Sequence, residues 1–338
     1  MPSFRTGWVT EIIEERPGLQ RVWVVDGDQP PERAYVLTDQ VGPVAVGNPV
    51  VFNTTAVDLG LGTGGWHVVH WNLARESWSQ PGPGHIMKQR YTSLQTDTGA
   101  AEEALDPPAH LAGTPVVVCS LHSQVPVVAA AFQARHPGGQ VVYVMTDGAA
   151  LPMALSDLVV SMVDLGLVHA TITAGHAFGG MREAVSVPSA LALAVHADDA
   201  DLIVVGMGPG VVGTDSALGT TAVEVAGILD AAAALGGRPI CCVRASEADP
   251  RPRHRGASHH VSTILALTRS RVEVATVAGA EVSDARHEVH VVDPGDVPAL
   301  LAERSLEVRS MGRGPDDDPL FFAAAGAAGV LAAEPQTD

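Results

Sequence analysis

Residues 115–146 read PVVVCSLHSQVPVVAAAFQARHPGGQVVYVMT, two continuous apolar runs on either side of an alanine-rich segment of helical length. Continuous valine runs, unlike alternating ones, are typical of strands that are buried on both faces of a sheet. A strand, a helix and a second strand in this order predict two parallel strands joined by a crossover helix. The stretch therefore predicts an α/β domain with a largely parallel sheet.

The same alternation continues towards the end of the chain. Further strands are predicted at residues 170–173, 202–205, 240–243, 272–277 and 289–292, and further helices at 151–165, 217–235 and 258–269. We expect residues 116–338 to form a doubly wound, mostly parallel, Rossmann-like α/β domain.

The first 93 residues have a different pattern. Short β-branched and aromatic runs at 8–13, 20–25, 34–37, 49–52 and 66–70 are separated by glycine and Asp-Gly turns. All five tryptophans of the chain lie here. Residues 1–93 therefore predict a small N-terminal β-barrel domain with an aromatic core. Residues 94–115, rich in Gly, Ala, Glu and Pro, predict a linker.

The charge balance excludes several classes of partner. The 20 cationic and 38 acidic residues give a net charge of −18, which repels phosphate backbones and anionic lipid. We expect no nucleic acid and no membrane as partner, and a small anionic molecule instead. Homo-oligomer formation is left open by the sequence.

The expected compartment is the cytoplasm. Three cysteines form no disulfide framework and suit a reducing environment, and no signal segment opens the sequence. The longest apolar tail, Leu320 to Ala333, is shorter than the roughly 20 residues of a membrane-spanning helix.

Polar residues follow successive strands of the predicted sheet. Ligands of open parallel sheets bind beyond the carboxyl ends of the strands, so these residues are candidates for a shared site. His122, Asp147 and His176 follow the first three strands and could transfer protons in a catalytic reaction. A serine nucleophile is disfavoured, because Ser120 lies in no G-x-S-x-G elbow.

A glycine-rich loop follows the fourth strand. Its backbone amides would hold an anionic ligand through Gly206, Gly208, Gly210, Gly213 and Thr214. The spacing G-x-G-x-x-G at 208–213 also fits a dinucleotide fingerprint. However, it follows the fourth predicted strand rather than the first, and no acidic residue lies at a strand end about 20 residues further on to bind a ribose. A tight turn that packs helix on strand remains the alternative.

A dense basic segment, 251–255, leads into a helix that Ser258 would cap. Arg244, Arg253, Arg255 and His259 would neutralise the ligand, because guanidinium groups suit phosphate and carboxylate oxygens. The alternative is a solvated loop whose arginines pair with nearby acids. His259 and the adjacent His260 would point about 100° apart on a helix, so at most one is expected to face the site.

No metal ligand is assigned and the cofactor is unknown. His122, Asp147, His176 and His259 are suitable ligand types for a divalent metal, but only the strand-end argument brings them together.

Several long motifs carry a family resemblance. They are TDGAALP (146–152), GHAFGG (175–180), MGPGVVGT (207–214) and RHRGASHH (253–260), with NTTAV (53–57) and LGTGG (61–65) in the first domain. On these motifs the chain resembles an uncharacterised domain-of-unknown-function family of Gram-positive (actinobacterial and related) bacteria, over nearly its whole length. The resemblance implies no activity. In that family an acid follows the pair Gly179-Gly180, whereas this chain has Met181 there, which weakens any metal site that needs this carboxylate.

The sequence thus predicts binding, with or without turnover, of a small anionic, phosphorylated ligand at the carboxyl edge of the α/β sheet. An enzyme of this kind would be a transferase or hydrolase acting on a small phosphorylated or carboxylated substrate. The alternative is a non-catalytic ligand sensor or assembly module whose β-barrel binds another protein.

Overall fold

The computed structural model describes residues 1–62 and 64–335, and the chain divides into two compact units, Met1–Gly99 and Ala100–Asp338. The division lies within the segment 94–115 that the sequence indicates as a linker. That segment carries the short strand β7 (Thr96–Asp97), which pairs with β6 (Met87–Lys88), and the short helix α3 (Glu102–Leu105).

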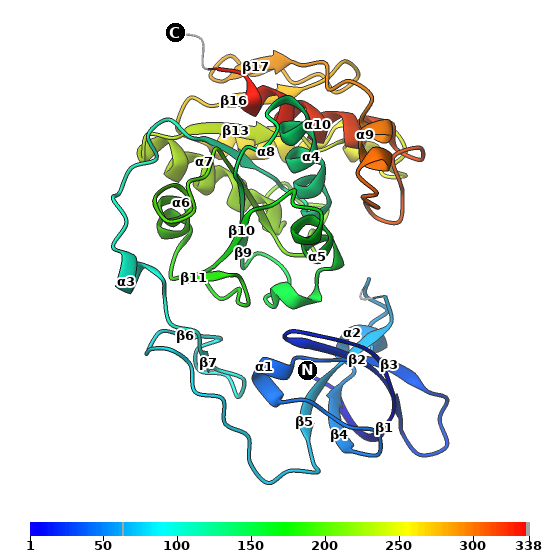
Figure 1. Ribbon diagram of the computed structural model, residues 1–338. Coiled ribbons are helices and arrows are strands. Elements are labelled where there is room, and N and C mark those ends of the chain that lie inside the picture. Colours follow the sequence, from blue (N-terminus) through cyan, green and yellow to red (C-terminus); the bar gives the residue numbers. More distant parts are fainter. Residues whose placement is uncertain (63, 336–338) are drawn as a thin grey trace. The chain divides into compact units, whose positions relative to one another are not determined.

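The first unit contains a closed five-stranded barrel in the order β1-β2-β3-β5-β4 (Figure 1). Strands β3 and β5 run parallel, and the other neighbouring pairs are antiparallel. The elements are β1 (Phe4–Arg16), β2 (Leu19–Val25), β3 (Glu32–Val36), α1 (Thr38–Val41), β4 (Pro49–Asn53), α2 (Thr55–Asp58) and β5 (Trp66–Asn72). The predicted N-terminal β-barrel is confirmed.

The barrel core is aliphatic rather than aromatic. Val22 and Val24 are fully buried, and Phe52 is the aromatic residue of their cluster. Between the two valines Trp23 lies on the other face of β2 and is only half-buried, while Trp8 is 50% exposed. The predicted aromatic core is therefore wrong, because strand alternation turns the small residues inward and the tryptophans outward.

The second unit is built on one eight-stranded sheet in the order β11-β10-β9-β12-β8-β13-β16-β17. Every neighbouring pair is parallel. The strands are β8 (Pro115–Val118), β9 (Val141–Thr146), β10 (Ala170–Ala174), β11 (Arg182–Ala184), β12 (Leu202–Met207), β13 (Arg238–Cys242), β16 (Glu273–Thr276) and β17 (Glu288–Val291). The predicted strands are present, and the added β11 is too short and polar to form an apolar run.

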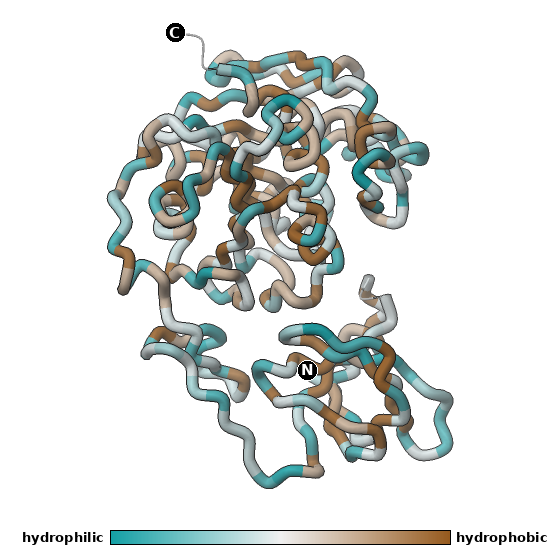
Figure 2. Tube along the Cα trace, in the orientation of Figure 1, coloured by the Kyte–Doolittle hydropathy of each residue, from teal (hydrophilic) through white to brown (hydrophobic). Residues whose placement is uncertain are grey.

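Helices cover both faces of this sheet, so the doubly wound α/β fold is confirmed (Figure 1). One face is covered by α4 (Val125–Arg135), α5 (Asp157–Asp164), α9 (Val297–Glu303) and α10 (Pro319–Ala333), the other by α6 (Val187–His196), α7 (Glu224–Ala234) and α8 (His259–Leu267). The central strands are the apolar interior between these layers (Figure 2). Among the described residues, no helix has the length and apolarity to span a bilayer.

The segments that follow the neighbouring strands β8 and β12 lie on opposite faces of the sheet. The 3-10 turn η1 (His122–Gln124) and α4 follow β8 on one face, whereas η3 (Thr221–Val223) and α7 follow β12 on the other. In open α/β sheets such a divergence marks the ligand-binding edge. A ligand site is therefore expected at the carboxyl ends of β8, β12 and the adjacent β13. Shorter elements beside them are η2 (Met153–Leu155), β14 (Ala245–Ser246), η4 (Pro252–His254) and β15 (Gly256–Ala257).

Candidate functional site

His122, in the turn after β8, is buried, and both of its ring nitrogens have hydrogen-bond partners. Its Nε2 lies 2.6 Å from Ser156 Oγ, and its Nδ1 lies 3.2 Å from both Tyr143 Oη and Met207 O. Burial lowers the pKa of His122 to about 4, so the ring is neutral at pH 7. The imidazole thus contacts β9, the end of β12 and the N-cap of α5, and the catalytic role of His122 stays a prediction.

Asp147 and His176 lie together at the ends of β9 and β10. The Asp147 Oδ2 accepts a hydrogen bond from the backbone N–H of His176 at 2.9 Å. Glu224, at the start of α7, is a third group here, and its Oε1 accepts a hydrogen bond from Thr146 Oγ1 at 2.6 Å. Burial, and then repulsion by Asp147, raise the pKa of Glu224 to about 7. A carboxyl group that titrates near neutrality can donate or accept a proton at this edge.

Gly206 lies inside β12 rather than in the loop that follows. A Cβ at this position would lie 3.3 Å from both Cys119 Cβ and Val125 Cγ2, so the glycine allows β12 to pack against its neighbours. The predicted place of Gly206 in a ligand-holding loop is therefore wrong. The strand continues to Met207, beyond the apolar run from which its end was predicted.

The remaining glycines shape the loop after β12. A Cβ at Gly208 would lie 2.7 Å from Ala150 O, and Gly210 has a φ of +101°, which favours glycine. Gly213 pairs with Thr220 in an isolated β-bridge. The fold of this loop depends on these glycines whether or not a ligand binds.

Thr214 uses its hydroxyl within the loop, where Oγ1 donates to Gly219 O at 3.1 Å. Helix α7 begins only at Glu224, after η3. The spacing 208–213 is therefore not followed directly by the helix N-terminus that a dinucleotide fingerprint requires.

Arg244 follows β13 and is a buried cation, with its side chain 6% exposed. Its side-chain contacts to described residues are long: Nη2 lies 3.8 Å from Asp249 Oδ2 and 3.9 Å from Met311 Sδ. Burial, followed by repulsion from nearby arginines, lowers the pKa of Arg244 to about 10. A guanidinium group has several N–H donors, so most of those of Arg244 lack an oxygen acceptor within the described chain.

The carboxylate nearest to Arg244 is already occupied. Asp249 accepts hydrogen bonds from Arg251, at 2.9 Å from Nε to Oδ1 and at 2.8 Å from Nη2 to Oδ2. Arg313 Nη2 lies 3.8 Å from the same Oδ2. The bidentate contact with Arg251 holds the pKa of Asp249 well below its usual range. Three arginines therefore converge on one buried carboxylate, in a chain whose net charge is −18.

Arg253 links this region to the loop after β12, since its Nη2 lies 2.6 Å from Asp215 Oδ1. Three imidazoles complete the region. We call this set the arginine–histidine cluster: Arg244, Asp249, Arg251, Arg253, His254, His259 and His260.

The three imidazoles are in mutual contact. The ring centroid of His254 lies 5.1 Å from those of His259 and His260, which are 4.2 Å from each other. The prediction that at most one of the adjacent histidines faces a shared site is therefore wrong. They are the first two residues of α8 after the N-cap Ser258, and flexible χ angles bring both rings against His254.

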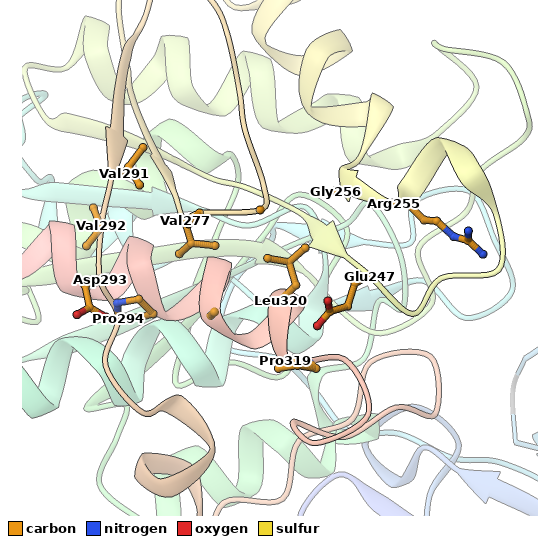
Figure 3. Close-up of a pocket in the computed structure, with 13 residues that line it drawn as sticks. Glu247, Arg255, Gly256, Val277, Val291, Val292, Asp293, Pro294, Pro319 and Leu320 are labelled. Atoms are coloured by element: carbon orange, nitrogen blue, oxygen red, sulfur yellow. The ribbon is translucent and has the colours of Figure 1, made fainter.

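Arg255 is among the residues that line a cavity of about 770 Å³ near the ends of β16 and β17 (Figure 3). The charged lining residues are Arg255, Glu247 and Asp293, and the others are apolar or glycine. The Arg255 Nε donates to Asp249 O at 3.1 Å. Arg255 therefore keeps a contact with the arginine–histidine cluster, and the joint contact of Arg253 and Arg255 with one anion stays a prediction.

The family model described as "Protein of unknown function (DUF3866)" matches residues 33–329. The chain belongs to this family. The match includes the whole arginine–histidine cluster and confirms the resemblance to a domain-of-unknown-function family. No curated protein matches the sequence. Among solved structures, the crystal structure of YjeQ from Thermotoga maritima is similar at 10% identity, over 89% of this chain and 82% of that chain, with a TM-score of 0.15.

Sequence reasoning on this DUF3866 member misses Glu224 and Arg313 as site residues. Glu224 begins a helix just after the N-cap Thr220 of η3, and an acid at a helix start is a signal that could have identified it. Arg313 reaches the cluster from a distant segment, and no local pattern marks it.

Proposed function

We propose that the α/β unit binds a small oxyanion, a phosphorylated or carboxylated molecule, at the carboxyl edge of its sheet. Arg244 carries this proposal. A buried charge with few hydrogen bonds is costly to the fold, and a bound oxyanion would provide the acceptors that the protein does not. The planar guanidinium group suits the paired oxygens of phosphate and carboxylate.

The surroundings of Arg244 support an anionic ligand. Arg251 and Arg253 are 40% and 32% exposed, so they offer positive charge at the surface of the cluster. Ser258, whose backbone N–H donates to Arg244 O at 2.8 Å, places the start of α8 beside Arg244. The positive end of that helix dipole also favours an anion near His259.

Turnover of the ligand would be transferase or hydrolase chemistry. Asp147, His176 and Glu224 are the groups that would move protons, with His122 held more deeply. The raised pKa of Glu224 supports this part of the proposal, since perturbed carboxyl groups gather at catalytic sites.

The alternative function is a sensor or assembly module whose β-barrel binds another protein. The outward tryptophans favour it, because Trp8 and Phe4 on β1 are 50% and 46% exposed. Exposed aromatic residues are common at protein interfaces. A second copy of the chain is one partner that fits, and nucleic acid and membrane do not fit the acidic charge.

We place this function in the cytoplasm of Gram-positive bacteria. Cys119, Cys241 and Cys242 are free and buried, which suits a reducing compartment. The bacterial range follows from the motif resemblance.

A thermal-shift panel tests the proposal. Phosphate, sugar phosphates, nucleotides and carboxylates are compared with chloride at constant ionic strength. A ligand at about 100 times its Kd adds roughly 2.7 kcal/mol of stability, which raises the melting temperature of a unit of this size by about 5–10 °C. The shift disappears in Arg244→Met and persists in Arg135→Met, which removes an exposed arginine on α4. The proposal fails if no oxyanion raises the melting temperature.

A further inference from the structure

Three histidines of the arginine–histidine cluster are arranged like metal ligands. His254, His259 and His260 each offer one ring nitrogen, and these nitrogens all lie within 4.8 Å of one another. A tetrahedral Zn²⁺ with Zn–N distances of about 2.0–2.1 Å needs ligand nitrogens about 3.3 Å apart. The ring nitrogens would therefore come closer together when an ion binds.

The ring nitrogens are available to a ligand. Both ring nitrogens of His260 and Nε2 of His259 are buried and have no hydrogen-bond partner. Buried polar atoms without partners are rare in folded proteins, and an ion is one of the few explanations for them.

Ser258 supports the histidines through hydrogen bonds to His254 and His260. Ser258 Oγ lies 2.7 Å from Nδ1 of His254 and accepts the backbone N–H of His260 at 3.3 Å. Metal-bound histidines almost always donate their other ring N–H to such an acceptor. When Nε2 of His254 binds a cation, its Nδ1–H can donate to Ser258.

We propose that His254, His259 and His260 form a binding site for a divalent transition-metal ion of the Zn²⁺ type. Three imidazole ligands select Zn²⁺ and its neighbours rather than Mg²⁺ or Ca²⁺, which prefer oxygen. Three protein ligands leave one tetrahedral position for water or an oxyanion. The site does not depend on the anion-binding function proposed above.

The arginines do not prevent metal binding. Arg251 forms a bidentate contact with Asp249, and Arg253 lies 2.6 Å from Asp215, so an acidic partner reduces the repulsion between each of these arginines and a cation. Arg244 has only a long ion pair, 3.8 Å from Asp249 Oδ2, and its charge would favour an anionic group in the open position of the metal. In this geometry the cation and the guanidinium would share one anion.

Zn²⁺ alone is the probe. The full chain is freed of metal with a chelator and titrated with Zn²⁺ against a chromogenic competitor, in chloride buffer without phosphate. We expect one Zn²⁺ per chain, and Co²⁺ at the same site shows the visible absorption of tetrahedral nitrogen coordination. His259→Ala, at a half-buried position, loses stoichiometric binding, whereas His169→Ala, an exposed histidine outside the cluster, binds as the wild type does.

Ser258→Ala removes both the hydrogen-bond acceptor of His254 and the N-cap of α8. It weakens Zn²⁺ binding about 10–100-fold, the usual effect of losing a ligand's hydrogen-bond acceptor. Ser186→Ala removes the matching N-cap of α6 and leaves Zn²⁺ affinity unchanged. Circular dichroism confirms that each variant is folded. The proposal is overturned if the wild type binds no Zn²⁺, or if folded His259→Ala binds it as tightly as the wild type. Because no oxyanion is present, neither result bears on anion binding.

Discussion

Replacing Glu224 by Gln changes how the stability of the α/β unit depends on pH. The pKa of the Glu224 carboxyl group rises from 4.5 to about 7 in the folded protein, mainly because this group is buried at the start of α7. The native state therefore keeps the proton over a pH range in which the unfolded chain releases it. Between pH 4.5 and about pH 7 the free energy of unfolding falls as pH rises, and the loss is complete above the folded pKa.

The size of the effect follows from the shift. One pKa unit corresponds to about 1.4 kcal/mol, so Glu224 costs the fold about 3 kcal/mol at pH 8 and nothing at pH 4. Glutamine resembles the protonated carboxyl group and can still accept the hydrogen bond of Thr146. Glu224→Gln is therefore about 3 kcal/mol more stable than the wild type at pH 8, and equal to it at pH 4.

Urea unfolding at several pH values measures this difference. All five tryptophans lie in the first unit, so unfolding of the α/β unit is followed by far-ultraviolet circular dichroism. Groups that do not interact with Glu224 contribute equally to both proteins, and their contributions cancel. Glu303→Gln, at an exposed position in α9, is the control variant. A Glu224→Gln effect that is the same at pH 4 and pH 8 would refute the buried, neutral carboxyl group.

Two further predictions concern helix packing and a buried ion pair in the α/β unit. A Cβ at Gly329 in α10 would collide with Val128 O and lie 2.9 Å from Ala131 Cβ. Gly329→Ala therefore lowers the free energy of unfolding by about 1–3 kcal/mol. In Gly227→Ala, on α7, the new Cβ meets open space, and the substitution raises the free energy of unfolding by about 0.5–1 kcal/mol. Equal effects in urea unfolding would contradict the α4–α10 contact. Arg238 holds Glu273 through two hydrogen bonds of 2.7 Å, so Arg238→Met costs about 3–5 kcal/mol and a second change, Glu273→Met, recovers most of it. A double variant as unstable as the single one would show that the loss does not come from the unpaired carboxylate.

The strands and layers could be predicted because local pattern and tertiary role coincide. Runs such as Val116 to Val118 are apolar at every position, which only a strand buried on both faces requires. The barrel core was harder to predict, because tryptophan suggests burial by its size. In β2 the alternation of Val22, Trp23 and Val24 gives the inward face to valine.

The site could be predicted only in outline. Strand ends locate Asp147, His176 and Arg244 at one edge of the sheet, since parallel strands all finish there. Which side chains then meet depends on turns of a few residues: the first turn of α8 brings His259 and His260 together, in contact with His254. The properties of Glu224 depend on burial, which no local pattern reports.

Phosphate titration calorimetry on the wild type, Arg244→Met and Arg135→Met tests the central claim most directly, with ionic strength held constant by chloride. A hydrogen-bonded contact to a charged group is worth about 1.5–3 kcal/mol, so loss of Arg244 weakens binding about 10–100-fold. Arg135→Met binds as the wild type does. Equal Kd values for all three proteins, or no binding of phosphate or of any organic phosphate or carboxylate by the wild type, would contradict an oxyanion site at Arg244.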